Sequence, residues 1–217
     1  PSTGLPGQVI APPDVPAAVR NQAWTKAAQI RKKIVGVESG ITDSVVDAAS
    51  DLGAEMYGLE WRVKDEASLA RKIATDFVDQ SLKFPDQTVA QVGDKVGDSL
   101  RYTMIFDDAD YVDGVSRAVR DLTERGYELA KPPKNYWSVP NDELPYNGIN
   151  MNWRAPDGTL VEIQFHTEAG LETKQLIHPL YEKQRQIGLD SIEFERLRLL
   201  MQKTADTLDY PRDVTDL

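Results

Sequence analysis

Residues 149 to 167 constrain the fold most, because they hold two alternating segments joined by a turn. The second segment, "TLVEIQFHT" (159–167), alternates apolar with polar residues: Val161, Ile163 and Phe165 against Glu162, Gln164 and His166. A period of two is typical of a strand that buries one face. The polar face holds an acid, an amide and one of only 2 histidines in the chain. It is therefore either a solvated surface or the floor of a site.

The turn between the two segments indicates their register. In "APDG" (155–158), Pro stands at the second turn position and Gly at the fourth, which fits a type I turn closed by a left-handed Gly. This turn predicts three facing pairs: Ala155 with Thr159, Asn152 with Glu162, and Asn150 with Gln164. A slip by one residue would mix the apolar and polar faces, so the pattern favours this register.

The predicted register gathers polar side chains on one face of the hairpin. They are Asn150, Asn152, Arg154, Glu162, Gln164 and His166. Converging groups of this kind bind magnesium, sugar hydroxyls or phosphate. A solvated antiparallel face is the alternative, and the hairpin alone leaves both open.

The rest of the chain predicts helices and strands around this hairpin. A Pro-rich extended arm (1–14) precedes two helices (15–37 and 41–53), the second with Thr42 or Asp43 as its cap and Gly53 as its stop. A strand (54–64), a helix opened by Asp65 (65–80) and a polar loop (81–96) follow.

The second half continues in the same way. It predicts a strand (98–106), a helix ended by Gly126 (109–126), a short strand with a long Pro-punctuated loop (127–146), the hairpin, and helices at 170–187 and 190–208, the last capped by Asp190 with Glu193. This order predicts an α+β fold with a single mixed sheet of about five strands flanked by helices. We expect a single domain (15–210) followed by a short C-terminal tail (211–217).

Charge and composition exclude several classes of function. With 25 Lys and Arg against 35 Asp and Glu, the net charge of −10 argues against a broad nucleic-acid surface, although a local cation cluster can still hold a small anion. The absence of cysteine removes disulfides and thiolate chemistry, and no apolar run predicts a membrane span. The chain opens on Pro1 in an uncharged Pro-rich stretch, so we expect a processed, extracellular protein, with the cytoplasm as the alternative.

Cations precede a helix start in "EWRVKDEASLARK" (60–72). Arg62 and Lys64 are predicted on one strand face, Ser68 in the first turn of the following helix, and Lys72 one turn later. Free N–H groups at a helix N-terminus beside positive side chains form a cradle for an anion. The alternative is a surface strand with interspersed charges.

A second acid opens a buried strand in "DSLRYTMIF" (98–106). Asp98 is either a turn residue or, together with Glu162, half of a carboxylate pair. Two carboxylates are the common protein contribution to a magnesium ion that water and phosphates otherwise surround. Arg101 follows three residues after Asp98.

These stretches together resemble the RelA/SpoT-type nucleotide pyrophosphokinase (synthetase) domain. Its R-x-K-x-x-x-S-x-x-x-K run matches Arg62, Lys64, Ser68 and Lys72, its strand opened by a magnesium-binding Asp matches Asp98, and its N-G-Y and E-I-Q-[IF]-[RH]-T segments are similar to "YNGIN" (146–150) and "EIQFHT" (162–167). The resemblance spans about residues 55 to 185 in the family's order. Freestanding domains of this family include secreted nucleotide 3′-pyrophosphokinases.

Two departures from the family pattern matter. The family's Asp is commonly followed by A-G-x-R, whereas Arg101 comes sooner here, which leaves its role open. The tyrosine that stacks on the acceptor base in many members falls at Ile149, so Tyr146, Tyr136 or Trp137 would supply the ring instead. Guanine preference is therefore not implied.

The resemblance implies Mg²⁺-dependent transfer of the β,γ-pyrophosphate of ATP to the 3′-hydroxyl of a purine nucleotide, with release of AMP. Asp98 and Glu162 would hold the metal, with Glu162 alternatively the base, and Arg62, Lys64 and Lys72 would act in catalysis. The implied ATP contacts are Arg62, Lys64, Ser68, Lys72 and Arg101. The implied acceptor contacts are Tyr146, Asn150, Gln164 and His166. Helical spacing adds Lys174, His178, Tyr181 and Arg185, whose shared helix face either reaches the acceptor phosphates or is a solvated surface with Tyr181 as a half-buried anchor.

Two other functions stay open beside this one: an inactive nucleotide-binding module of the same fold, and a toxin that uses the same chemistry to deplete ATP. The expected partners are ATP and a purine nucleotide acceptor, with no nucleic acid and no membrane. We expect a monomer.

Overall fold

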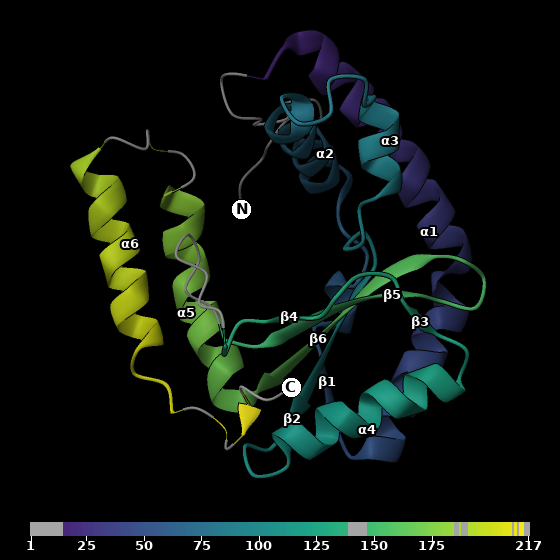
Figure 1. The fold of residues 1–217 in the computed structure, drawn as a ribbon, viewed down its shortest axis with the longest axis vertical. Coiled ribbons are helices and arrows are strands. Elements are labelled where there is room, and N and C mark those ends of the chain that lie inside the picture. Colours follow the sequence, from purple (N-terminus) through teal and green to yellow (C-terminus); the bar gives the residue numbers. More distant parts are fainter. Residues whose placement is uncertain are drawn as a thin grey trace.

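The computed structural model describes residues 15–138, 147–184, 187, 191–209, 211 and 213–214 (Figure 1). The predicted N-terminal arm (1–14), part of the long loop (139–146) and most of the C-terminal tail lie outside these residues. Within the described ranges, no helix combines the length and apolar character that crossing a lipid bilayer demands.

The centre of the molecule is one mixed sheet, as the sequence predicts. Its strands lie in the order β1 (Glu55–Tyr57), β2 (Arg101–Phe106), β6 (Leu160–Thr167), β5 (Ile149–Arg154) and β3 (Glu128–Leu129), and β4 (Lys134–Asn135) also pairs with β5. The β2–β6 pair is parallel and the other pairs are antiparallel. The α+β prediction is confirmed.

The hairpin has the predicted register. Asn150 pairs with Gln164 and Asn152 with Glu162. Gly158 adopts φ 85°, and the Ala155 N–H donates to the Thr159 carbonyl at 2.8 Å. The turn residues and the two-residue period thus act together, because both are local properties of the chain.

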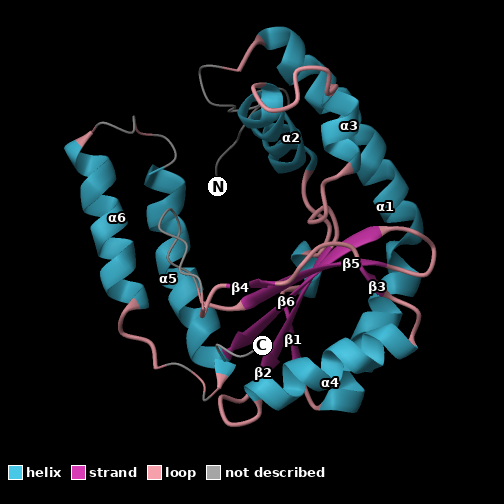
Figure 2. Cartoon of the chain, viewed as in Figure 1, coloured by secondary structure: helices cyan, strands magenta, loops and turns pink. Residues whose placement is uncertain are grey.

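The apolar face of the sheet packs against α1 (Ala17–Leu52) and α4 (Tyr111–Glu124), as Figure 2 shows. The core between them includes Tyr102, Met104, Ile163, Phe165 and Trp153. The opposite, polar face points toward α2 (Glu66–Ser81) and α5 (Glu168–Gln184). Because one face is fully covered, the polar residues of the hairpin all lie on the side that stays open.

Residues 17 to 52 form one helix, so the prediction of two helices was wrong. Gly36 and Gly40 lie within it, and a Cβ at either would meet nothing within 4 Å. Thr42 is not a cap, because its hydroxyl bonds to Glu38 and Tyr102 at 2.8 Å each. The helix ends at Gly53 as predicted, with φ 70°.

The predicted strand at 54–64 is also wrong in most of its length. β1 stops at Tyr57, Gly58 adopts φ 67°, and a 3₁₀ turn, η1 (Leu59–Trp61), follows. Only Val63 forms a further bridge, to Leu100. The left-handed Gly breaks the extended chain, so Arg62 and Lys64 do not share a strand face.

Two further helices, α2 and α3 (Val89–Asp94), pack beside the first half of α1. Asp65 caps α2 by accepting from the Ser68 N–H at 2.8 Å, as predicted. The predicted loop at 81–96 contains α3, which a capping box of Thr88 and Gln91 opens. Together with the first half of α1, these helices bury a second cluster around Leu69 and Ile73.

The chain ends in a helix pair. α5 packs on α6 (Ile192–Ala205) through a small cluster of Ile177, Met201 and Ala205. Ser191 caps α6 by accepting from the Phe194 N–H at 3.0 Å, so the sequence placed the cap one residue early at Asp190, which lies outside the described residues. α5 lies on the side of the polar sheet face that is opposite α2 (Figure 1).

Candidate active site

A cleft of about 770 Å³ opens over the polar face of the sheet. Its walls come from η1 and the segment after it, from α2, from β2, β5 and β6, and from α5. A volume of this size suits a substrate larger than a single small ring, since ligand pockets typically measure roughly 300–1,000 Å³. The cleft therefore lies where the sequence analysis expected a site.

The start of α2 lines one wall of this cleft. Ser68, Lys72 and Thr75 recur at helical spacing on the face that borders it, together with Arg71. The first N–H groups of a helix carry partial positive charge and lack intrahelical acceptors. The N-terminal turn and two cations therefore face the same space.

Asp98 lies at the centre of the cations. Lys64 Nζ donates to Asp98 Oδ2 at 2.5 Å, and both side chains are only 18% exposed. Burial works to raise the pKa of Asp98, but the charges of Lys64 and Lys72 outweigh it and the pKa is lowered. The carboxylate thus stays ionised, and its Oδ1 is buried without a hydrogen-bond partner among the described residues.

Lys72 lies close enough to both predicted acids, Asp98 and Glu162, to feel their charges. Burial works to lower its pKa, while Asp98 and Asp76, and more weakly Glu162, raise it above the ordinary value. Its Nζ lies 3.4 Å from Asp76 Oδ2. Asp98 and Glu162 therefore act on the same ammonium group.

Glu162 is held by a chain of side-chain hydrogen bonds that begins on α5. Lys174 Nζ donates to Gln164 Oε1 at 2.7 Å, and Gln164 Nε2 donates to Glu162 Oε2 at 2.6 Å. On the neighbouring strand, the parallel register places Arg101 beside Glu162. Burial, reinforced by the charge of Arg101, lowers the pKa of Lys174 to about 7.

The end of the hairpin's polar face that carries Gln164 and His166 is not a solvated surface, whereas Arg154 at the other end is exposed. Gln164 is 4% exposed and His166 is fully buried. Burial, with Lys174 and Arg101 nearby, holds the pKa of His166 well below its usual range, so the ring is neutral. Lys174, which lines the cleft, connects it to His166, since its Nζ lies 3.3 Å from His166 Nε2.

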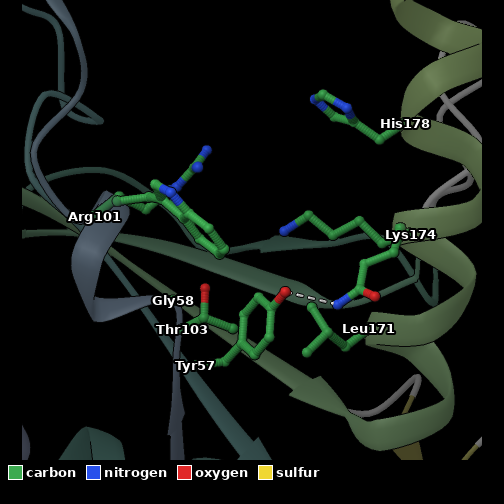
Figure 3. A pocket seen from close by; sticks show the side chains of 9 residues that line it. Tyr57, Gly58, Arg101, Thr103, Leu171, Lys174 and His178 are labelled. Atoms are coloured by element: carbon green, nitrogen blue, oxygen red, sulfur yellow. Dashed lines mark hydrogen bonds between the residues drawn. The ribbon is translucent and has the colours of Figure 1, made fainter. Parts of the chain in front are cut away.

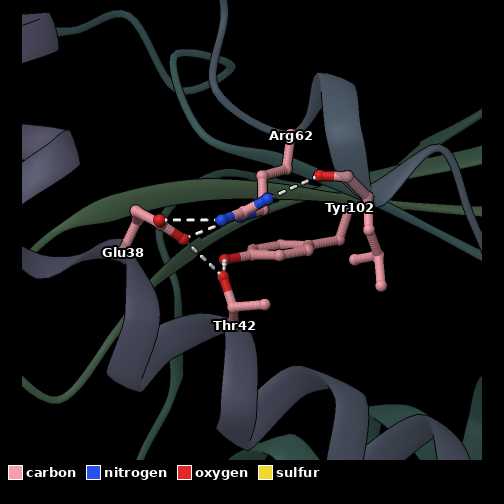
Figure 4. Close-up of polar contacts among 5 residues, drawn as sticks. Glu38, Thr42, Arg62 and Tyr102 are labelled. Carbon is pink, nitrogen blue, oxygen red and sulfur yellow. Dashed lines mark hydrogen bonds and ion pairs between the residues drawn. The ribbon is translucent and has the colours of Figure 1, made fainter.

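Arg62 points away from the other cations. Its Nε and one terminal nitrogen donate to the two oxygens of Glu38 on α1 at 2.7 and 2.8 Å, and the other terminal nitrogen donates to the Leu59 carbonyl (Figure 4). The Arg62 hydrogen bonds hold the pKa of Glu38 below its ordinary value. Arg62 still borders the cleft, while its guanidinium is engaged on the α1 side.

The remaining sequence-predicted residues divide into three groups. Asn150, Lys174, His178 and Tyr181 line the cleft together with Tyr136. Trp137 is 2% exposed and donates from Nε1 to the Tyr111 hydroxyl, so the suggestion that it stacks on a base was wrong. Tyr146 and Arg185 lie outside the described residues.

Sequence reasoning missed several residues that line the cleft, among them Trp61, Arg71 and Thr75. Arg71 and Thr75 follow Ser68 at helical spacing, so the α2 pattern carries a usable signal for them. No such signal exists for Trp61, because its exposure depends on the turn at Gly58.

Comparison with known proteins defines the fold. No family model matches the sequence, and no curated protein matches it. Among solved structures, the small alarmone synthetase 2 from Bacillus subtilis is similar, with 13% identity, a TM-score of 0.50, and coverage of 83% of this chain and 90% of that chain. The chain therefore has the fold of a RelA/SpoT-type pyrophosphokinase.

Two further solved structures show weaker likeness. A GTP pyrophosphokinase family protein from Streptococcus pneumoniae is 19% identical over 88% of this chain and 86% of its own, with a TM-score of 0.48. The Type VI effector Tas1, solved in complex with its immunity protein, is 18% identical over 87% of this chain and 95% of its own, with a TM-score of 0.43.

Proposed function

We propose that the protein transfers the β,γ-pyrophosphate of ATP to the 3′-hydroxyl of a purine nucleotide in a magnesium-dependent reaction. The observation that carries this proposal is the ionised, half-buried Asp98 between Lys64 and Lys72, close to Glu162 and to the start of α2. Transfer of a phosphoryl group needs alignment and charge neutralisation more than covalent catalysis. The cleft offers both signs of charge for that task.

The donor set suits a magnesium ion. Across the described ranges, no three acidic or histidine side chains converge into a cage made of protein alone. Asp98 nevertheless presents a buried oxygen without a partner, and Glu162 supplies a second carboxylate nearby. Mg²⁺ is commonly held by one or two carboxylates while water and substrate phosphates supply the other ligands. A bound ion would neutralise phosphate charge between these two residues.

The phosphates of ATP would lie against the first turn of α2. Lys64, Lys72 and Ser68 border this part of the cleft, and Arg101 faces it from β2. Arg62 would join them only by exchanging the Glu38 carboxylate for a phosphate, which is an equivalent partner for its planar fork.

The acceptor would lie between the sheet and α5. Asn150 and Gln164 present amides from neighbouring strands, and Lys174, His178 and Tyr181 face them from α5. Glu162, oriented by Gln164, would accept the proton of the 3′-hydroxyl as its oxygen attacks the β-phosphorus. The bond between that phosphorus and the α,β-bridging oxygen breaks, and AMP leaves.

A product analysis tests this function. The purified protein is incubated with magnesium, ATP and each of AMP, ADP, GMP, GDP and GTP in turn, and the products are resolved by anion exchange. We expect AMP and a more highly charged acceptor in equal amounts. ATP binding without any product would show an inactive module, and formation of ADP or orthophosphate instead would refute pyrophosphate transfer.

A further inference from the structure

A second, smaller pocket of about 130 Å³ adjoins the cleft on the side of β1. It shares Trp61, Arg101 and Lys174 with the cleft, so a ligand can occupy both at once. A cavity of roughly 150 Å³ accommodates a single benzene ring. The small pocket alone has about the size of a single aromatic ring, so a purine placed there would also extend into the cleft, which has room for the rest of a nucleotide.

One wall of this pocket is aromatic and unusually open to solvent. Trp61 is 62% exposed and Tyr57 is 36% exposed, and their ring centroids lie 6.2 Å apart at an angle of 54°. The burial of a large ring is strongly favourable, so two exposed rings at a pocket mouth indicate a contact surface.

The local backbone holds these rings in place. Gly58 adopts φ 67°, and a Cβ there would lie 3.1 Å from the Trp61 ring, so the indole packs directly against the glycine. The Tyr57 hydroxyl accepts a hydrogen bond from Gln175 Nε2 of α5 at 2.9 Å, which Figure 3 shows as the dashed line. The aromatic wall is thus fixed at both ends before any ligand binds.

The other walls supply the remaining features of a base site. Arg101 and Thr103 line the pocket from β2, and Leu171 lines it from α5. A guanidinium and an aromatic ring both stack on planar rings, and a hydroxyl can donate or accept at the ring edge. This combination of π-faces, a cation and a few polar groups is typical of nucleobase recognition.

We propose that this pocket binds the purine ring of one of the two nucleotides, with Trp61 and Tyr57 as its stacking surface. The inference rests on the proposed function, because phosphates held in the cleft would bring the attached base to Arg101. It also supplies the stacking ring that the family pattern would put at residue 149, where this chain has Ile149, which is buried in the core and 1% exposed. Trp61 and Tyr57 are then specificity-determining residues for the purine.

Binding of ligands with and without a base tests the proposal. The affinities of ATP, GDP and tripolyphosphate are measured by calorimetry for the wild type, Trp61→Ala and Trp61→Phe. Because stacking contributes roughly 5- to 150-fold in affinity per base, Trp61→Ala should weaken the binding of a nucleotide by a factor in that range and leave the binding of tripolyphosphate unchanged. Trp61→Phe keeps a ring and should retain most of the affinity. Phe84→Ala is the matched control, because Phe84 is 56% exposed and lies outside both pockets.

The nucleotide that weakens identifies the substrate. A loss for ATP alone assigns the pocket to the donor adenine, a loss for GDP alone assigns it to the acceptor, and a loss for both means that either base can enter. If Trp61→Ala and Tyr57→Ala bind ATP and GDP as tightly as the wild type, the proposal is wrong. If these variants bind both nucleotides normally and product still forms, the base site is refuted and the proposed function stands. If the variants bind nucleotides more weakly but even the wild type forms no product, the base site stands and only the proposed function is refuted.

A spectroscopic signature separates stacking from indirect effects. Stacking on an indole quenches its fluorescence, so ATP or GDP should quench the wild type. Trp61→Phe should lose that quenching while Trp24, Trp137 and Trp153 remain as internal reporters. Equal quenching in Trp61→Phe would place the base elsewhere.

Discussion

At the scale of single residues, the chain from Lys174 through Gln164 to Glu162 has one consistent polarity. The Gln164 amide has its oxygen toward the ammonium and its nitrogen toward the carboxylate. An amide can satisfy both neighbours in only one orientation, so each end of the chain fixes the other. This arrangement presents the carboxylate of Glu162 in a defined geometry.

Glu162→Gln removes the proposed base while keeping the shape of the side chain. We expect kcat to fall by roughly 10²- to 10⁴-fold, which is the usual contribution of a positioned acid–base group. Glu128→Gln, at an exposed position on β3, should change nothing and serves as the control. The measurement is the rate of AMP release from ATP with a saturating acceptor, and a rate within a few-fold of wild type would remove Glu162 from the chemistry.

Lys174 also makes the stability of the protein depend on pH. Burial lowers its folded-state pKa to about 7, whereas an unfolded lysine titrates near 10.4. Between these values the unfolded state binds more protons, so stability rises with pH. From about pH 7 to about pH 9, the free energy of unfolding of the wild type should gain about 2 kcal/mol relative to Lys174→Met.

Urea titrations at both pH values measure this difference. Lys203→Met, at an exposed position near the end of α6, is the matched control and should follow the wild type. Arg101, Glu162 and the neutral His166 lie around Lys174. Parallel curves for wild type and Lys174→Met would contradict the assigned burial of the ammonium.

At the scale of secondary-structure elements, glycines in helices carry different meanings that sequence alone does not separate. The sequence predicted two helices separated at residues 38–40, yet α1 runs through Gly36 and Gly40 because its apolar residues pack into the core on either side. Gly114 in α4 instead allows close packing, since a Cβ there would lie 2.5 Å from the Phe106 ring. Propensity is a weak guide where tertiary packing decides.

Alanine at two of these positions should have opposite effects. Gly40→Ala lies in an exposed helix interior with free space around it and should stabilise the protein by about 0.5–1 kcal/mol. Gly114→Ala should destabilise it by about 1–3 kcal/mol, because α4 must move away from β2. Thermal or urea unfolding of the two variants decides the matter, and a destabilised Gly40→Ala would argue for a real break in α1.

Elements whose information is local could be predicted from the sequence. The hairpin register and the Asp65 cap of α2 followed from turn residues, alternation and cap chemistry a few positions apart. The direction of the Arg62 side chain could not, because its guanidinium is held by Glu38, which is 24 residues away. The cleft residues were mostly found, since motif spacing places Lys64, Ser68 and Lys72 together even when the predicted strand beneath them is wrong.

At the scale of the whole molecule, the parallel contact of β2 with β6 creates the site. It brings Arg101 next to Glu162, although the two are far apart in the sequence. The polar face of the sheet on which they lie is bordered by α2 on one side and by α5 on the other. Nothing local specifies that pairing, so only the mixed character of the sheet could be expected beforehand. The cations of the cleft belong to a chain whose net charge is −10.

This contrast between local and overall charge predicts the salt dependence of ATP association. The long-range field of an acidic protein repels an anionic nucleotide, and salt screens that repulsion as the Debye length falls from roughly 30 Å at about 0.01 M to roughly 8 Å at about 0.15 M. The contacts with half-buried groups such as Lys64 are screened less. The association rate constant should therefore rise, or at least not fall, over this range of salt concentration.

Stopped-flow measurement of ATP binding through tryptophan fluorescence tests this expectation, with uncharged adenosine as the ligand that salt should not affect. Removing acids far from the cleft should have the same effect as salt. Asp107→Asn combined with Asp108→Asn, at exposed positions after β2, should raise the association rate constant at low salt and lose that advantage at high salt. An association rate constant that falls steeply as salt is added would mean that the cations, rather than the acidic surface, dominate the field that an approaching nucleotide meets.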